Sequence, residues 1–197
     1  WGGLIPTSAI ASRKLGSRLF LDHIGFASTM IAFYLLPMLL FKGKSTVNLL
    51  RIFFLNKKNY YLMFLIVIYL FYLLVFYDLN EQSIVGKGFV NKISIILFDE
   101  GVFRNIFIYF SFFISWLVIL IYIDNKLIDV LTISYFFILS IFLWPIHQEY
   151  FDPLILLMVF TFFDTKVILN YRNSIALYFY LFLLIISANI YYFNLLN

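Results

Sequence analysis

The chain alternates between long apolar runs and short polar segments, and this pattern predicts membrane-spanning helices. The runs are apolar throughout and lack the period of two that marks the strands of a membrane barrel. A helix needs about 20 apolar residues to cross a bilayer. The predicted spans are His23–Phe41, Tyr60–Tyr77, Asn105–Ile123, Ile128–Trp144, Pro153–Phe163 and Ser174–Phe193. A kink is expected in the first span at Pro37.

Two further segments are predicted to be helices that lie along the membrane surface. Val47 to Leu55 is apolar and falls within the acid-free basic segment Lys42–Asn59. Phe89 to Phe98 is apolar but too short to span. We therefore expect an all-α fold, a polytopic transmembrane helical bundle of about six spans with one or two interfacial helices. Residues 1–197 form a single transmembrane domain in this interpretation.

Composition supports an integral membrane protein. Of the 197 residues, 64% are hydrophobic and only 12% are charged, more apolar surface than a soluble domain of this size can bury. No cysteine is present, which excludes disulfides, thiolate metal sites and cysteine nucleophiles. The net charge of +4 is modest, and we expect no nucleic-acid partner. Because the sequence begins at Trp1 without a methionine, we expect it to be the C-terminal portion of a longer membrane enzyme.

Six spans would place alternate connections on opposite sides of the membrane. One side has segments 42–59, 124–127 and 164–173 with eight basic residues, and the other has 1–22, 78–104 and 146–152 with six. Lys and Arg favour the cytoplasmic side, so we place the acid-free segment Lys42–Asn59 in the cytoplasm. The polar segments of the other set, including Gly86–Lys92, then share the non-cytoplasmic face.

The segment His147–Pro153 puts ionisable side chains between two predicted spans, with almost no room for a solvated loop. Charged groups at membrane depth are costly and usually serve a function. His147, Glu149 and Asp152 are the candidate catalytic residues, because a carboxylate beside a histidine can act as a general base. The alternative is a polar turn that only reverses the chain. Asp152 would then be the cap of a helix that starts at Pro153.

A second group of candidates lies near the start of the chain. Clustered Arg and Lys side chains can hold a phosphate and stabilise its charge as it leaves. The candidate substrate-binding residues are Trp1, Gly2, Gly3, Arg13, Lys14, Arg18, Gln148 and Tyr150. The alternatives are attraction of the three cations to anionic head groups, an interfacial anchor for Trp1, and turn formation by the two glycines.

Several common sites are absent from the sequence. There is no phosphate-binding loop, no Gly-x-Ser-x-Gly and no dinucleotide fingerprint. The two histidines and the scattered acids lack the spacing of a metal site. We therefore expect no cofactor and no catalytic metal.

Three short motifs resemble the C-terminal half of GT-C membrane glycosyltransferases. They are Trp1-Gly2-Gly3-Leu4-Ile5-Pro6, Tyr34-Leu35-Leu36-Pro37 inside the first span, and Glu149-Tyr150-Phe151-Asp152-Pro153 before an apolar helix. The likeness is to the dolichyl-phosphate-glucose-dependent alpha-1,2-glucosyltransferase family and its bacterial relatives. It implies inverting transfer of a sugar from a polyprenyl-phosphate donor to a lipid-linked or glycan acceptor on the non-cytoplasmic face. It also implies a key acid in an external loop upstream of Trp1.

The expected location is the bacterial inner membrane, or the endoplasmic reticulum membrane in a eukaryote, with membrane lipid as a further partner. Two rival functions stay open. A lipid-linked saccharide transporter or polymerase would also need a basic external face, but a transporter should carry polar groups along the middle of its spans. The predicted spans are nearly devoid of charge. A non-catalytic membrane subunit would have no need for polar groups gathered on one face.

Overall fold

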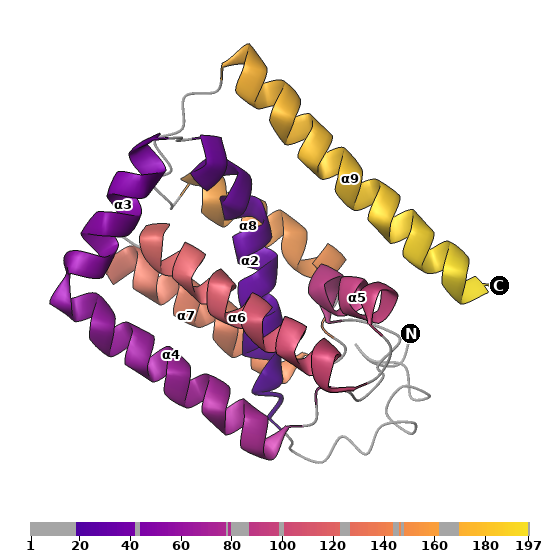
Figure 1. The fold of residues 1–197 in the computed structure, drawn as a ribbon, viewed down its shortest axis with the longest axis horizontal. Helices are drawn as coiled ribbons and strands as arrows, with labels where there is room; N and C mark the ends of the chain where they lie inside the picture. Colours follow the sequence, from indigo (N-terminus) through magenta and orange to yellow (C-terminus); the bar gives the residue numbers. More distant parts are fainter. Residues whose placement is uncertain are drawn as a thin grey trace, which may run out of the picture.

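The computed structural model describes residues 19–41, 44–77, 79, 87–98, 101–122, 127–143, 146, 148–161 and 170–196. These residues form helices, without a strand in the described part of the chain. The helices are α2 (Asp22–Phe41), α3 (Lys44–Leu55), α4 (Lys57–Phe76), α5 (Gly88–Leu97), α6 (Val102–Tyr122), α7 (Leu127–Phe142), α8 (Gln148–Thr161) and α9 (Tyr171–Leu196) (Figure 1). The all-α prediction is confirmed.

Three helices are long and apolar enough to cross a membrane. Their apolar stretches are Asp22–Leu39 in α2, Asn59–Phe76 in α4 and Val102–Tyr122 in α6. Helices also form at the positions of the other predicted spans, as α7, α8 and α9. That all six cross the bilayer stays a prediction. The two segments predicted to lie on the membrane surface are helical, as α3 and α5.

Helix α2 is the centre of the bundle. Its apolar stretch is 83% buried, and it packs against α5, α6, α7, α8 and α9. The approach to α6 is close because of Gly25, where a Cβ atom would lie 2.4 Å from the ring of Phe112. Small residues let helix backbones approach closely in membranes, where dispersion contacts rather than water exclusion drive association. Gly25 therefore allows the close packing of α2 against α6.

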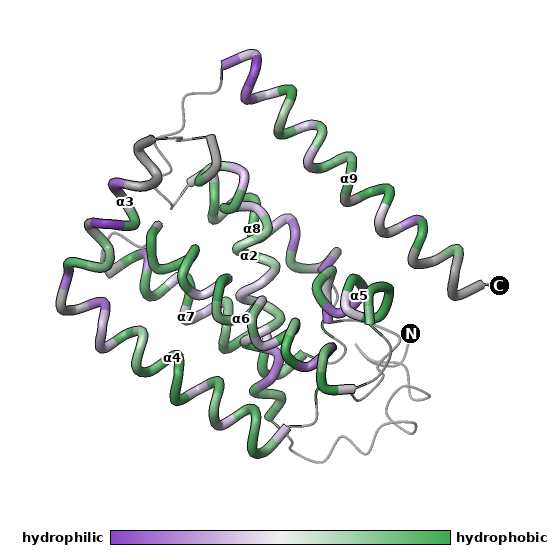
Figure 2. Tube along the Cα trace, in the orientation of Figure 1, coloured by the Kyte–Doolittle hydropathy of each residue, from purple (hydrophilic) through white to green (hydrophobic). Residues whose placement is uncertain are grey.

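Helix α4 lies at the outside of the bundle. Its apolar stretch contains no charged residue, and a helix of this kind in a soluble protein would be buried. Here only 11% of the stretch is buried. Hydrophobic residues cover α4, and they also extend along much of α9 (Figure 2). Phe64, Phe71 and Phe76 on α4 are each more than 60% exposed. A helix that is apolar all round is suited to lipid contact rather than to water.

Side chains of α4 satisfy backbone groups at both ends of the helix. At the α3–α4 corner, Asn59 Nδ2 donates to Phe53 O over 2.8 Å, and the Tyr60 hydroxyl donates to Phe54 O over 2.8 Å. These carbonyls belong to the last turn of α3, where no intrahelical donor remains. Near the other end, the Tyr69 hydroxyl donates to Leu21 O over 2.8 Å. The sharp reversal between α3 and α4 therefore leaves these carbonyls paired.

The start of α8 corrects the sequence prediction. The helix begins at Gln148, so Asp152 and Pro153 lie inside it instead of at its start. The helix extends by more than a turn before Pro153, so the N–H that the proline lacks would otherwise bond to the carbonyl of Glu149. The interpretation of Asp152 as a helix cap is therefore wrong. The connection from α7 to α8 is short, as predicted.

Candidate functional site

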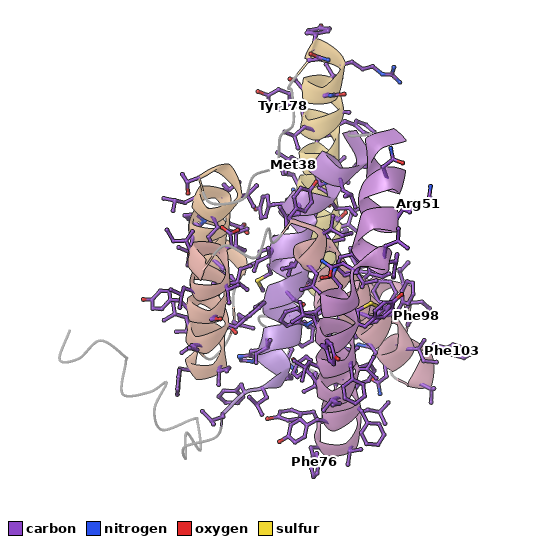
Figure 3. All side chains as sticks on the ribbon, turned by 90° about the vertical axis from the view of Figure 1, so that its left-hand side faces the viewer. Met38, Arg51, Phe76, Phe98, Phe103 and Tyr178 are labelled. Atoms are coloured by element: carbon purple, nitrogen blue, oxygen red, sulfur yellow. The ribbon has the colours of Figure 1, made fainter. Side chains whose placement is uncertain are left out.

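Hydrogen bonds link the ends of several helices at one end of the bundle, which we call the polar end. Here α2, α6 and α8 begin, α4 and α7 finish, and α5 packs against α2 and α6. Figure 3 shows that Met38 of α2 and Arg51 of α3 lie toward the opposite end from Phe76. Links at the polar end include Phe20 N to Ile141 O at 3.3 Å, Lys87 N to Ile146 O at 2.7 Å, and Leu21 N to the Tyr77 hydroxyl at 3.3 Å.

A buried ion pair joins α2 to the residue before α5. Lys87 Nζ lies 3.5 Å from Asp22 Oδ2, and both side chains are almost fully buried. The Lys87 ammonium also lies 5.4 Å from the ring centroid of Phe26, within reach of a cation–π interaction. Lys87 has a φ of 62°, in the left-handed region that non-glycine residues rarely adopt. Its bond to Ile146 O holds the backbone in this conformation.

His23 follows Asp22 and is fully buried. Its Nδ1 lies 3.1 Å from Ser140 O, a carbonyl that can only accept, so Nδ1 carries the proton in this contact. The imidazole stacks on Phe20 with ring centroids 5.0 Å apart. The pair Asp22–His23 therefore anchors the start of α2 to both α5 and the end of α7.

A second buried cation lies at the start of α6. Arg104 is 1% exposed, and its Nε donates to Ser94 Oγ over 3.2 Å. Its Nη2 donates to Asn91 Oδ1 over 3.0 Å. Both acceptors are buried on one side of α5. Polar contacts from Arg104 of α6 therefore hold the buried side of α5 against the bundle.

Two of the predicted site residues, Gln148 and Asp152, belong to a polar network around Tyr34. Gln148 Oε1 accepts a hydrogen bond from Phe89 N over 3.1 Å, so it satisfies a free amide in the first turn of α5. The Tyr34 hydroxyl interacts with the side chains of both Gln148 and Asp152. A carboxylate, a phenol and an amide from α2 and α8 are thus connected. Such a group can orient a hydroxyl and accept its proton.

The other predicted site residues are less completely described. Glu149 and Tyr150 belong to the first turn of α8, and their side chains lie outside the described set. The remaining residues lie outside the described part of the chain: Trp1, Gly2, Gly3, Arg13, Lys14, Arg18 and His147. Their predicted roles stay predictions.

Sequence reasoning missed most of the buried polar residues of the polar end. By sequence alone, these residues are polar positions near span ends or in connections: Asp22, His23, Lys87 and Arg104. One available signal was the position of charged residues directly beside apolar runs, because such residues are either at the membrane surface or paired inside the protein. Tyr34 had no polar neighbour in sequence that could reveal its interaction with Asp152.

Within the described residues, no group of three or more His, Asp or Glu side chains could hold a metal ion. No protein-family model, no curated protein and no solved structure matches the chain. The functional argument therefore depends on the residues and on their arrangement.

Proposed function

We propose that this protein is an integral membrane glycosyltransferase that transfers a sugar from a polyprenyl-phosphate donor to a lipid-linked or glycan acceptor on the non-cytoplasmic face. The observation that carries the proposal is the concentration of buried polar groups at one end of an apolar bundle. Asp152, which belongs to one motif that resembles GT-C enzymes, interacts with Tyr34 of a second such motif, and Gln148, directly before the first motif, interacts with the same hydroxyl. Two motifs that are far apart in sequence thus meet through their polar side chains.

The proposed reaction is a single displacement. The acceptor hydroxyl oxygen forms a bond to the anomeric carbon, and the bond from that carbon to the phosphate oxygen breaks. A carboxylate takes the proton of the hydroxyl, and the lipid leaves as polyprenyl phosphate. In this proposal Asp152, with Tyr34 and Gln148, positions the acceptor, while Arg13 or Lys14 contacts the donor phosphate. Glu149 with His147 orients the acceptor or the leaving group.

The positions of the buried charges favour an enzyme over an ion-coupled transporter. The structure buries five Asp, His, Lys or Arg side chains among the described residues. All five lie next to helix ends. They are Asp22, His23, Lys87, Arg104 and Asp129. A transporter binds its substrate and coupling ion near the middle of the bilayer, where discontinuous helices supply the ligands. Mid-helix buried polar residues such as Ser28 and Thr29 instead bond to carbonyls of their own helix.

The test is sugar transfer from polyprenyl-phosphate sugars by the full-length protein in proteoliposomes. Asp152→Asn and Tyr34→Phe should each slow transfer by about 10-fold or more, since a hydrogen bond to a charged group is worth roughly 1.5–3 kcal/mol. Arg13→Ala and Lys14→Ala should have a similar effect if they hold the phosphate. Asp129→Asn is the matched control, because Asp129 lies in the first turn of α7, away from the polar end.

Wild-type rates for all four site variants at equal expression would reject the assignment of the site. Absence of transfer from every polyprenyl-phosphate sugar by the wild type would reject the proposed function itself. The Asp129→Asn control separates loss of chemistry from loss of folding, since it removes a buried carboxylate that lies outside the proposed site.

A further inference from the structure

Two hydrogen bonds hold the first turn of α5 against the start of α8. Lys87 N donates to Ile146 O over 2.7 Å, and Phe89 N donates to Gln148 Oε1 over 3.1 Å. The donors are two residues apart in the chain, and so are the acceptors. The two segments therefore run side by side in a fixed register, which aims the Phe89 amide at the Gln148 side chain.

The same turn of α5 packs closely on α2. Gly88 has a φ of +70°, and a Cβ atom there would lie 2.6 Å from Met30 Cε. Only glycine meets both conditions without strain. The rings of Phe89 and Phe33 pack with their centroids 4.7 Å apart. The start of α5 is thereby fixed beside Phe33, the residue directly before Tyr34.

Hydrogen bonds run in one direction from the Phe89 amide to Asp152. A backbone N–H can only donate, so the Gln148 side chain turns its oxygen to Phe89 and has its NH2 group left for the Tyr34 hydroxyl. The same hydroxyl bonds to Asp152, whose ionised carboxylate can only accept. The hydroxyl has one proton, so it donates to Asp152 and accepts from Gln148.

We propose that Gln148 is a positioning residue for Asp152 and acts on it through Tyr34. The inference rests on the proposed function, in which Asp152 contacts the acceptor. We call the chain of bonds from Phe89 N–H through Gln148 and Tyr34 to Asp152 the relay. Hydrogen bonds that point the same way polarise one another, so the bond to the carboxylate depends on the bonds before it.

The relay makes the site depend on the position of α5. A shift of the first turn of α5 would break the bond from Phe89 to Gln148 and weaken the hold on Asp152. The buried Asp22–Lys87 ion pair and the two side-chain bonds of Arg104 keep α5 in place. The buried charges of the polar end therefore support the orientation of Asp152, although none of them belongs to the relay.

The test is a double-substitution cycle on sugar transfer by the full-length protein in proteoliposomes. Gln148→Leu should lower kcat by about 10-fold with little change in KM for the donor, because the relay acts on the acceptor side of the reaction. In a Tyr34→Phe background the same substitution should lower kcat by less than about 2-fold, because the relay is already interrupted there.

Gln148→Glu separates the relay from a purely structural role of Gln148. An ionised Glu can still accept from Phe89 N, but it has no N–H to donate to Tyr34. If Gln148 only pairs the free amide of α5, Gln148→Glu should keep a near-wild-type kcat. The relay predicts a loss similar to that of Gln148→Leu, and this loss should disappear in the Tyr34→Phe background. Repulsion between two carboxylates would persist there.

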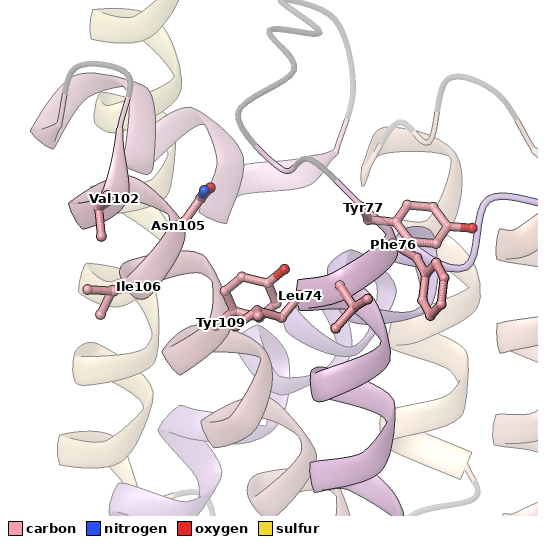
Figure 4. A pocket seen from close by; sticks show the side chains of 8 residues that line it. Leu74, Phe76, Tyr77, Val102, Asn105, Ile106 and Tyr109 are labelled. Atoms are coloured by element: carbon pink, nitrogen blue, oxygen red, sulfur yellow. The ribbon is translucent and has the colours of Figure 1, made fainter.

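Two other tyrosines supply control backgrounds. The Tyr180 hydroxyl donates to Phe33 O. Tyr109 lines a groove of about 610 Å³ between the end of α4 and the start of α6, and no residue of the relay lines this groove (Figure 4). Gln148→Leu should therefore keep its full effect on kcat in the Tyr180→Phe and Tyr109→Phe backgrounds.

Unfolding in denaturant gives a second readout that does not need sugar transfer. Gln148→Leu should raise the equilibrium constant of unfolding by a factor that is about 2-fold or more larger in the wild type than in Tyr34→Phe. Absence of transfer by the wild type would reject the proposed function, while this coupling would still test the relay. Additive effects of Gln148→Leu and Tyr34→Phe, on kcat or on unfolding, would overturn the inference, as would a near-wild-type kcat of Gln148→Glu.

Discussion

Asp22 and Lys87 illustrate how the bundle keeps two charges in its interior. Taking each ion out of water is expensive, and the attraction across 3.5 Å offsets this cost only while both charges are present. The Phe26 ring and the fixed backbone of Lys87 add to the constraint on the ammonium group. We therefore interpret this ion pair as the contact that stabilises the start of α2 against the start of α5.

Removing one partner should be worse than removing both. Asp22→Asn leaves a buried ammonium without its carboxylate, and we expect a loss of about 3–5 kcal/mol in the free energy of unfolding. The double variant Asp22→Asn with Lys87→Met removes the charge as well and should recover most of this loss. Denaturant unfolding in a fixed detergent measures both. A double variant that is less stable than Asp22→Asn alone would contradict this account.

At the scale of elements, the contact between α2 and α9 depends on a proline. Pro37 lies inside α2 and has no N–H, so the carbonyl of Phe33 loses its intrahelical donor. The Tyr180 hydroxyl of α9 donates to this carbonyl over 3.0 Å. The rings of Phe33 and Tyr180 also pack with centroids 4.8 Å apart. A gap in the hydrogen bonding of one helix therefore becomes the docking point of another.

We expect Tyr180→Phe to lower the free energy of unfolding by about 1–3 kcal/mol, because it leaves the Phe33 carbonyl without a donor. In a Pro37→Ala background the restored N–H can satisfy that carbonyl, so the same substitution should cost less. Tyr178→Phe is the control, since Tyr178 is 74% exposed on the same helix. Equal costs of Tyr180→Phe in the two backgrounds would show that Pro37 does not create the docking point.

At the scale of the whole molecule, the two ends of the bundle differ in their polar residues. The polar end gathers the buried ion pair and Arg104, whereas the Tyr34 network lies farther along α2. The α3–α4 corner lies toward the opposite end, in the basic segment that we place in the cytoplasm (Figure 1). If α4 and α6 span the bilayer, these two ends face opposite compartments.

Single cysteines can test this orientation, because the protein contains none. Asn56→Cys is at the α3–α4 corner, and Glu100→Cys is in the connection between α5 and α6. We expect an impermeant thiol reagent to label Glu100→Cys in intact cells and Asn56→Cys only after permeabilisation, because the basic segment resists translocation. Labelling of both positions from the same side would rule out the alternating six-span arrangement.

The sequence alone was sufficient for the fold class and for the approximate positions of the helices. Long apolar runs without a period of two favour helices in a bilayer, because every backbone group must be bonded there and a helix bonds its own. The prediction failed at α8, because local rules for Asp152-Pro153 favour a helix start there. Tertiary contacts extended the helix back to Gln148, whose side chain accepts a hydrogen bond from the free amide of Phe89.

The candidate site was only partly predictable for a similar reason. The unusual composition of His147–Pro153 marked Gln148 and Asp152 as polar residues in a costly place. No sequence pattern connects Asp22 with Lys87, Arg104 with Asn91, or Tyr34 with Asp152. These pairs form because packing around α2 brings distant helix ends together, and a buried polar group is stable only where such a partner meets it. Local sequence determined the helices, and the three-dimensional packing decided which polar side chains became partners.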